Sequence, residues 1–193
     1  MLVIDIQNTY MEVPEASDEA ERWKPFLQRM NGKVIPNAVK LVSFARKNKF
    51  ETIFARIACL TEDGRDRSLS QKKPGFNYLL LPKDSSESQF VDKLSAKGDE
   101  ITITKTTDSA LTGTNLRLIL HNLGIKNVIV AGIFTDQCVS STVRSLADES
   151  FNVVVVEDCC SAATMALHEH ELEIINMIYC HVVQLEDIAG FIC

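Results

Sequence analysis

Three reactive residues stand where an apolar run ends or has just ended. Asp5 interrupts the run that opens the chain, Lys105 closes a second run, and Cys138 follows a third. A cysteine thiolate is a strong nucleophile, a neighbouring ammonium group stabilises it, and a carboxylate can take up and return its proton. If the fold brings these side chains together, they could attack a carbonyl carbon.

Each of these residues also has a simpler structural interpretation. An acid at a strand end often pairs with a base or caps a turn, and a lysine there is usually solvated. Free cysteine is among the most buried residue types and commonly acts as a small hydrophobe. The chemical interpretation of Asp5, Lys105 and Cys138 therefore depends on where the fold puts them.

The position of Cys138 is the most informative of the three. Residues 127–133 have the composition of a buried strand, and residues 136–149 have that of the helix after it. Thr135 is the candidate N-cap, which puts Cys138 in the first helical turn. Backbone amides and the helix dipole favour an anion there, so we expect a lowered pKa for the thiol.

Short runs rich in Val and Ile recur along the chain and predict strands. They span residues 2–6, 52–57, 100–104, 127–133, 153–156 and 181–185. Several are apolar on consecutive residues, which is typical of strands buried on both faces of a parallel sheet. Helices are expected between them, at 34–48, 87–96, 114–122, 136–149 and 165–177. The alternation predicts an α/β fold with a mostly parallel sheet, whose strand ends at the carboxyl edge would gather Asp5 and Lys105.

Length, composition and charge narrow the class of protein. The chain has 193 residues with 46% hydrophobic and 24% charged, as in ordinary globular proteins, so we expect one domain over 1–193. A net charge of -6 with interspersed signs argues against a nucleic-acid surface. No signal peptide or membrane segment is visible. We therefore expect a small-molecule partner, no nucleic acid and no membrane.

The six cysteines show no CxxC spacing and are expected to be mostly free thiols, which favours a reducing, cytoplasmic location. The chain opens directly on an apolar strand at residue 2. Since mature domains rarely begin on a core strand, we suspect that further residues precede it.

Three segments together resemble one known family. VIDIQNTY is similar to the opening signature of the isochorismatase-like cysteine hydrolases, and KTTDSALTGTNL resembles their lysine segment. AGIFTDQCVSSTVRSLADESFNVVVVEDCCSAA is similar to their cysteine segment. The resemblance implies a three-layer, six-stranded parallel sheet and a catalytic triad of Asp5, Lys105 and Cys138. It also implies a cis peptide at Ile133-Phe134 and an oxyanion hole formed by the amides of Cys138 and a residue near Phe134.

Two departures from related enzymes narrow the expected activity. Nicotinamidases of this family carry an Asp-x-His metal motif after the second strand, where this chain has Arg56-Ile57-Ala58-Cys59. His168 and His170 lie on a predicted polar helix face and are expected to be solvated, so we predict no metal and no cofactor. Isochorismate-cleaving members act without a cysteine nucleophile, whereas Cys138 is present here.

Substrate contacts are harder to predict than the triad. Gln7, Tyr10, Arg56 and Phe134 lie at or near strand ends and are the candidates. Arg56, with Arg65 and Arg67 in the long loop over 59–86, could bind an acidic or carbamoyl group bidentately. Alternatively, Arg65 and Arg67 belong to a solvated charged loop, and Tyr10 and Phe134 belong to the core. The loop itself is expected to lie on the substrate side, as an excursion or lid.

The leading functional hypothesis is a metal-independent hydrolase of an amide-like bond that works through a Cys138 acyl-enzyme. Isochorismatase activity with Asp5 as general acid, and a catalytically idle binding module, are the alternatives. Apolar residues in 165–177 and in the tail 188–193 should pack on something. We predict a homo-oligomer, either a dimer or a tetramer, with a closed symmetric interface.

Overall fold

A single parallel sheet organises the chain in the computed structural model, which describes residues 1–12 and 18–191. Its six strands are β1 (Leu2–Ile4), β2 (Ile53–Ile57), β3 (Ile101–Lys105), β4 (Asn127–Ile133), β5 (Asn152–Ser161) and β6 (His181–Val183). They are arranged in the order β3-β2-β1-β4-β5-β6, and every neighbouring pair is parallel. The prediction of a six-stranded parallel α/β sheet is confirmed.

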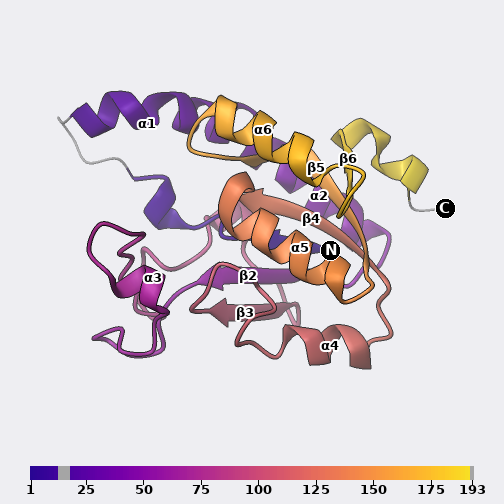
Figure 1. Ribbon diagram of the computed structural model, residues 1–193. Coiled ribbons are helices and arrows are strands. Elements are labelled where there is room, and N and C mark those ends of the chain that lie inside the picture. Colours follow the sequence, from indigo (N-terminus) through magenta and orange to yellow (C-terminus); the bar gives the residue numbers. More distant parts are fainter. Residues whose placement is uncertain (13–17, 192–193) are drawn as a thin grey trace.

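Helices cover both faces of the sheet and complete three layers (Figure 1). The helices are α1 (Asp18–Arg29), α2 (Ile35–Lys47), α3 (Leu69–Lys72), α4 (Leu116–Asn122), α5 (Ser140–Asp148) and α6 (Met165–Ile175), with a π-helical turn, Met30–Val34, joining α1 to α2. In β1, Leu2 and Ile4 face the core shared with α4, α5 and α6, whereas Val3 faces the core shared with α1 and α2. This two-sided burial is why the strands are apolar on consecutive residues.

One predicted helix does not form. Residues 87–96 contain only a short 3-10 turn, Asp92–Leu94. Polar side chains just before it bond to the backbone instead: the Ser88 hydroxyl donates to the carbonyl of Lys83, and the Gln89 amide donates to the carbonyls of Lys83 and Ser85. Such side-chain to backbone bonds compete with helix formation.

The loop over 59–86 is ordered by its own polar contacts. The Asp66 carboxylate accepts hydrogen bonds from the backbone amides of Leu60 and Thr61, and the Arg67 guanidinium donates to the carbonyls of Gly64 and Leu79. The loop lies on the side toward which β2 and β3 point (Figure 1). It therefore lies beyond the carboxyl edge of the sheet, as predicted, while its action as a lid stays a prediction.

The cysteines of the described residues are all free and buried: Cys59, Cys138, Cys159, Cys160 and Cys180. Cys193 lies outside the described residues. Burial raises the pKa of Cys160 and of Cys180 to about 12, so these two act as small hydrophobes.

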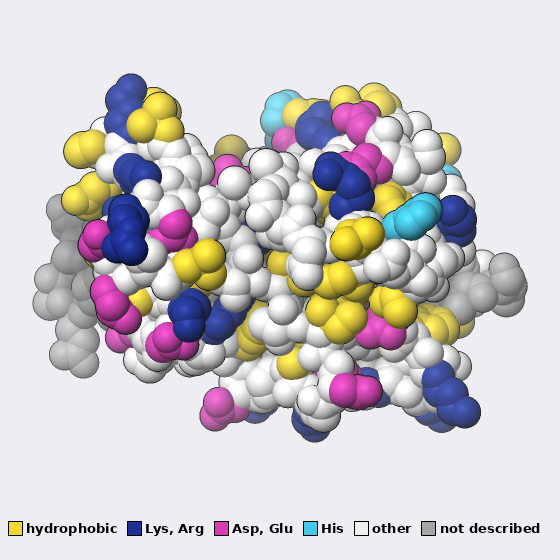
Figure 2. Space-filling model, turned by 90° about the horizontal axis from the view of Figure 1, so that it is seen from below, with side chains coloured by type: hydrophobic (Ala, Val, Ile, Leu, Met, Phe, Trp, Pro, Cys, Tyr) yellow, Lys and Arg dark blue, Asp and Glu magenta, His cyan; other side chains and the backbone are white. Residues whose placement is uncertain are grey.

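Charges of both signs are interspersed on the face shown in Figure 2, with hydrophobic side chains among them, and no basic stripe crosses that face. Among the helices of the described ranges, none is long and apolar enough to cross a membrane.

Candidate active site

Asp5 follows the last residue of β1 in a backbone conformation that side chains rarely adopt. Its φ is 52°, in the left-handed region, while its amide still donates to the carbonyl of Ala55 on β2 at 2.8 Å. Non-glycine residues occupy this region at a cost, and they are concentrated at functional sites. The turn directs a carboxylate that is 1% exposed into the end of the sheet.

Lys105 is the last residue of β3, on the far side of β2 from Asp5. Its Nζ lies 2.7 Å from Asp5 Oδ2, 3.3 Å from Cys138 Sγ and 3.2 Å from the carbonyl oxygen of Thr107. The ammonium thus donates to three acceptors. The three reactive residues predicted from the sequence, which are 100 and 33 positions apart in the chain, form one contact cluster.

Cys138 lies in a π-helical turn, Thr135–Val139, that leads directly into α5. The turn follows a cis peptide bond between Ile133 and Phe134. Phe134 occupies the N-cap position and no side chain caps the turn. The predicted N-cap role of Thr135 is therefore wrong: its hydroxyl is drawn away to Nδ1 of His168, at 2.8 Å.

The pKa of the Cys138 thiol shifts in the direction opposite to the one expected from its helix position alone. Burial raises the pKa of Cys138 well above its usual value, and the Asp5 carboxylate raises it further, although Lys105 opposes both effects. Desolvation disfavours the thiolate more than the turn and the ammonium favour it. The expected lowering of the pKa is therefore wrong, and the thiol is protonated at neutral pH.

Asp5 and Lys105 form a buried ion pair, and each shifts the pKa of the other. Burial raises the pKa of Asp5, while Lys105 and hydrogen bonding lower it in part. Burial by itself would lower the pKa of Lys105, but Asp5 and Cys138 raise it above the ordinary value. Oδ1 of Asp5 has no hydrogen-bond partner among the described residues, so one oxygen of the carboxylate remains able to accept a proton.

Aromatic rings gather around the turn that carries the thiol. Tyr10 and Phe134 meet edge to face with centroids 5.1 Å apart, and Trp23 and Phe26 of α1 also contact the Phe134 ring. Burial, followed by the charges of Asp5, Cys138 and Asp108, raises the pKa of Tyr10 well above its usual value. Tyr10 and Phe134 are therefore close to the cluster, and their contact with substrate stays a proposal.

Gln7 does not reach the site as a free amide. Its Nε2 donates to the carbonyls of Ile57 and Ser88, and its Oε1 accepts from the amide of Ile57. With these bonds the fully buried Gln7 side chain links the segment after β1 to the end of β2 and to the chain at Ser88. Its polar atoms already have backbone partners, and the contact of Gln7 with substrate stays a prediction.

The arginines predicted to bind an anionic substrate also have partners within the chain. Arg56 donates to Gln89 Oε1 and Thr104 Oγ1, and Arg65 pairs with Asp63 on the surface. The Arg67 guanidinium donates to carbonyls within its own loop. Arg56 is thus held near the carboxyl end of β2, and these residues no longer argue for an acidic substrate.

Two residues near the cluster were missed or misjudged from the sequence. Asp108 places Oδ1 3.9 Å from Cys138 Sγ, and its only sequence signal was its position three residues after Lys105. His168 was expected on a solvated helix face but is 2% exposed. Its Nε2 lies 2.8 Å from Arg29, whose guanidinium only donates, so Nδ1 carries the proton shared with Thr135. His170 is exposed, as expected.

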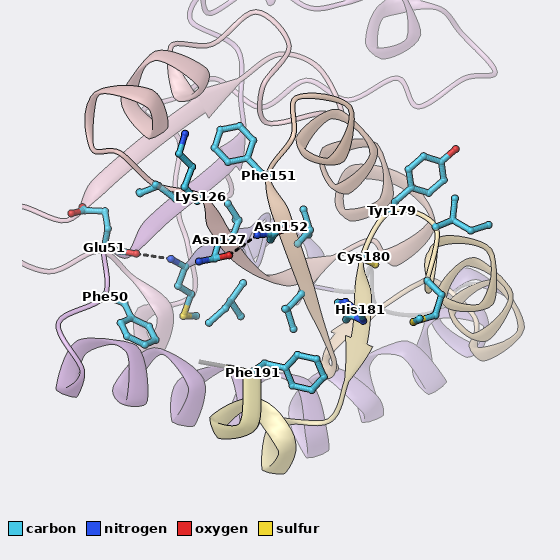
Figure 3. Close-up of a pocket in the computed structure, with 18 residues that line it drawn as sticks. Phe50, Glu51, Lys126, Asn127, Phe151, Asn152, Tyr179, Cys180, His181 and Phe191 are labelled. Carbon is cyan, nitrogen blue, oxygen red and sulfur yellow. Dashed lines mark hydrogen bonds between the residues drawn. The ribbon is translucent and has the colours of Figure 1, made fainter. Parts of the chain in front are cut away.

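A large cavity of about 750 Å³ lies away from this cluster, at the amino ends of β4, β5 and β6 (Figure 3). Asn127, Asn152 and His181 line it at the strand starts, together with Met1, whose amino group donates to the carbonyl of Glu51. Its cysteine, Cys180, is protonated. Ligands of open parallel sheets bind at the opposite, carboxyl ends. This cavity offers no comparable chemistry.

The described residues hold no cluster of side chains suited to a metal ion. No group of three or more His, Cys, Asp or Glu side chains in those ranges could hold a metal ion. Nothing in the cluster around Cys138 therefore assigns ligands to a metal.

Comparisons with known proteins agree with the fold and with the predicted family. Residues 1–187 match the family model described as the Isochorismatase domain. A probable inactive nicotinamidase of Arabidopsis thaliana is 30% identical over 87% of this chain and 83% of its own length. The ureidoacrylate amidohydrolase RutB of Acinetobacter baylyi is 25% identical over 87% of this chain and 73% of its own.

A solved structure shows the same fold at lower sequence identity. An isochorismatase family protein of Desulfovibrio vulgaris superposes with a TM-score of 0.81 at 23% identity, covering 98% of this chain and 95% of that chain. With the family model matched over nearly the whole sequence, the chain belongs to the isochorismatase family of hydrolases.

Proposed function

We propose that this hydrolase cleaves an amide-like C–N bond of a small molecule, with Cys138 as nucleophile, Asp5 as base and Lys105 as the cation that stabilises the thiolate. The observation that carries the proposal is the contact of Lys105 Nζ with both Asp5 Oδ2 and Cys138 Sγ in a buried site. Nucleophile, cation and proton acceptor in one cluster are the parts that thiol-based acyl transfer needs.

The protonated resting thiol determines the order of the first steps. As Sγ attacks the substrate carbonyl, its proton passes to the Asp5 carboxylate, and Lys105 stabilises the negative charge that develops on sulfur. Backbone amides of the turn, at Cys138 and close to Phe134, are the proposed donors to the oxyanion. The C–N bond then breaks, and Asp5 gives its proton to the departing amine or ammonia, which leaves a thioester on Cys138.

Water completes the cycle with the same groups. Asp5 takes a proton from the attacking water, whose oxygen bonds to the thioester carbonyl carbon. The C–S bond breaks and the carboxylic acid is released. The proton returns from Asp5 to the sulfur, which restores the protonated thiol and the ion pair with Lys105. The description of RutB as an amidohydrolase supports an amide as the substrate class.

Two other functions have an observation in their favour. The family model favours isochorismate cleavage, with Asp5 as general acid and Cys138 incidental. The Arabidopsis relative, described as probably inactive, favours an idle binding module. The intact cluster of nucleophile, cation and acid supports the amide hydrolase over both of these alternatives.

The test is a panel of small amides, ureas and isochorismate, with ammonia, amine or pyruvate measured as product. Cys138→Ala should lower amide hydrolysis by about 1,000-fold or more and prevent a thioester adduct visible by mass spectrometry. Cys180→Ala, a buried cysteine outside the site, is the matched control. Isochorismate turnover that survives Cys138→Ala would establish the second function, and a lack of turnover with every compound would favour the third.

A further inference from the structure

The charges beside the thiol do not cancel. Asp5 and Lys105 form an ion pair with Nζ 2.7 Å from Oδ2, and the neighbouring thiol is protonated. Asp108 adds a carboxylate whose Oδ1 lies 3.9 Å from Cys138 Sγ. Within the described ranges, the Asp108 carboxylate accepts one hydrogen bond, from the Cys138 thiol, and it forms no ion pair. A carboxylate has about four acceptor positions, so most of those of Asp108 are available to a ligand.

The surroundings of Asp108 favour a positive ligand group. Tyr10 packs against the core cluster that contains Cys138, its ring meets that of Phe134, and the faces of such rings attract cations. The ammonium of Lys105 is already bonded to Asp5, Cys138 and the Thr107 carbonyl. Arg56 is held by Gln89 and Thr104. An anionic substrate group at this place would meet Asp108 without a free cation to balance it.

We propose that Asp108, together with the rings of Tyr10 and Phe134, selects substrates that carry a cationic group, an ammonium or amidinium, beside the scissile amide. This inference rests on the proposed function for the position of the scissile bond, but the charge preference belongs to the site itself. Asp108 acts as a specificity-determining residue: it binds the cation and takes no part in the proton transfers of Asp5.

The first test measures charge selection without any turnover. Two methanethiosulfonates of matched size, one with an ethyltrimethylammonium group and one with an ethylsulfonate group, are reacted with the protein at one mildly alkaline pH. Modification of the Cys138 peptide is followed by mass spectrometry. After division by the rate ratio for a small free thiol, the cationic reagent should be favoured by about 10-fold or more. Asp108→Asn should remove the preference, whereas Asp148→Asn, an exposed acid at the end of α5, should keep it.

The second test uses three amides of similar size: 4-aminobutanamide with an ammonium group, neutral pentanamide, and succinamate with a carboxylate. The wild-type kcat/KM should be highest for the ammonium amide and lowest for succinamate. Asp108→Asn should lower the ratio between these two kcat/KM values by about 10-fold. The two failures are distinguishable. Turnover without charge preference overturns the role of Asp108 and leaves the amide hydrolase standing. Charge-selective thiol modification without turnover of any amide would overturn the amide hydrolase and leave the role of Asp108 standing.

Discussion

The ammonium of Lys105 lies 2.7 Å from Oδ2 of Asp5, and both side chains are almost fully buried. A buried ion pair contributes little net stability, but the removal of one partner leaves an uncompensated charge. The pair therefore makes the two residues depend on each other for stability as well as for chemistry.

Loss of Lys105 should therefore destabilise the fold through Asp5. We expect Lys105→Met to lower the free energy of unfolding by about 3–5 kcal/mol, measured by urea denaturation at neutral pH. The double variant Asp5→Asn/Lys105→Met should lose less than the sum of the two single variants, because neither position of the pair is then left with an unpaired charge. Additive losses would mean that the pair is not coupled.

His168 should make the stability depend on pH. Burial, and then the charges of Arg29 and Lys33, lower the pKa of His168 to about 4, from 6.5 in the unfolded chain. The unfolded state binds the proton first as pH falls, so stability is present above about pH 6.5 and is lost between there and about pH 4. This shift corresponds to up to about 3 kcal/mol.

The variant His168→Gln isolates this contribution from that of the acids. The free energy of unfolding, measured by urea denaturation at a series of pH values, should fall less steeply for His168→Gln than for the wild type between about pH 6.5 and pH 4. Parallel curves for the two proteins over this window would show that His168 does not titrate between the two states.

Gly132 should not tolerate a side chain. Its φ is 138°, and a Cβ there would lie 2.1 Å from the carbonyl oxygen of Ile4, the residue before Asp5. We expect Gly132→Ala to destabilise the protein by about 3 kcal/mol by urea denaturation and to displace Asp5. Gly32→Ala is the control, because nothing lies within 4 Å of the added atom. Equal stability of the two variants would contradict the close approach of β1 and β4.

A homo-oligomer remains the prediction for assembly. Ile188 of the apolar tail packs into the core, but Phe191 is half exposed, and residues 192–193 lie outside the described ranges. Large hydrophobic side chains are exposed on and just after α6: Met165, Leu167, Ile174, Met177 and Ile178. Such a surface is typical of interfaces. Light scattering should give at least twice the chain mass of 21.5 kDa.

Substitution within this surface tests where the interface lies. Ile178→Glu should shift the mass toward that of the monomer, whereas Leu60→Glu, an exposed control on the long loop, should not. A wild-type mass that stays at 21.5 kDa over a range of concentrations would contradict the prediction of an oligomer.

The sequence by itself determined the order of the six strands and the positions of Asp5, Lys105 and Cys138 along it, but it predicted a helix over 87–96 that does not form and did not predict α1 or α3. Short runs of consecutive apolar residues are typical of strands covered on both faces, so the parallel sheet could be predicted from local sequence. The carboxyl ends of its strands lie at one edge, and this geometry predicted that Asp5 and Lys105 would approach each other.

Only the tertiary structure decided how each polar group is used. Burial reversed the expected pKa shift of Cys138, because the cost of desolvation depends on packing from the whole chain. Gln7 bonds to backbone groups far away in sequence, and His168 is buried with hydrogen bonds to Arg29 and Thr135. Asp108 lies beside the thiol because the segment that follows β3 meets the turn before α5, a contact between residues 30 positions apart that no local pattern encodes.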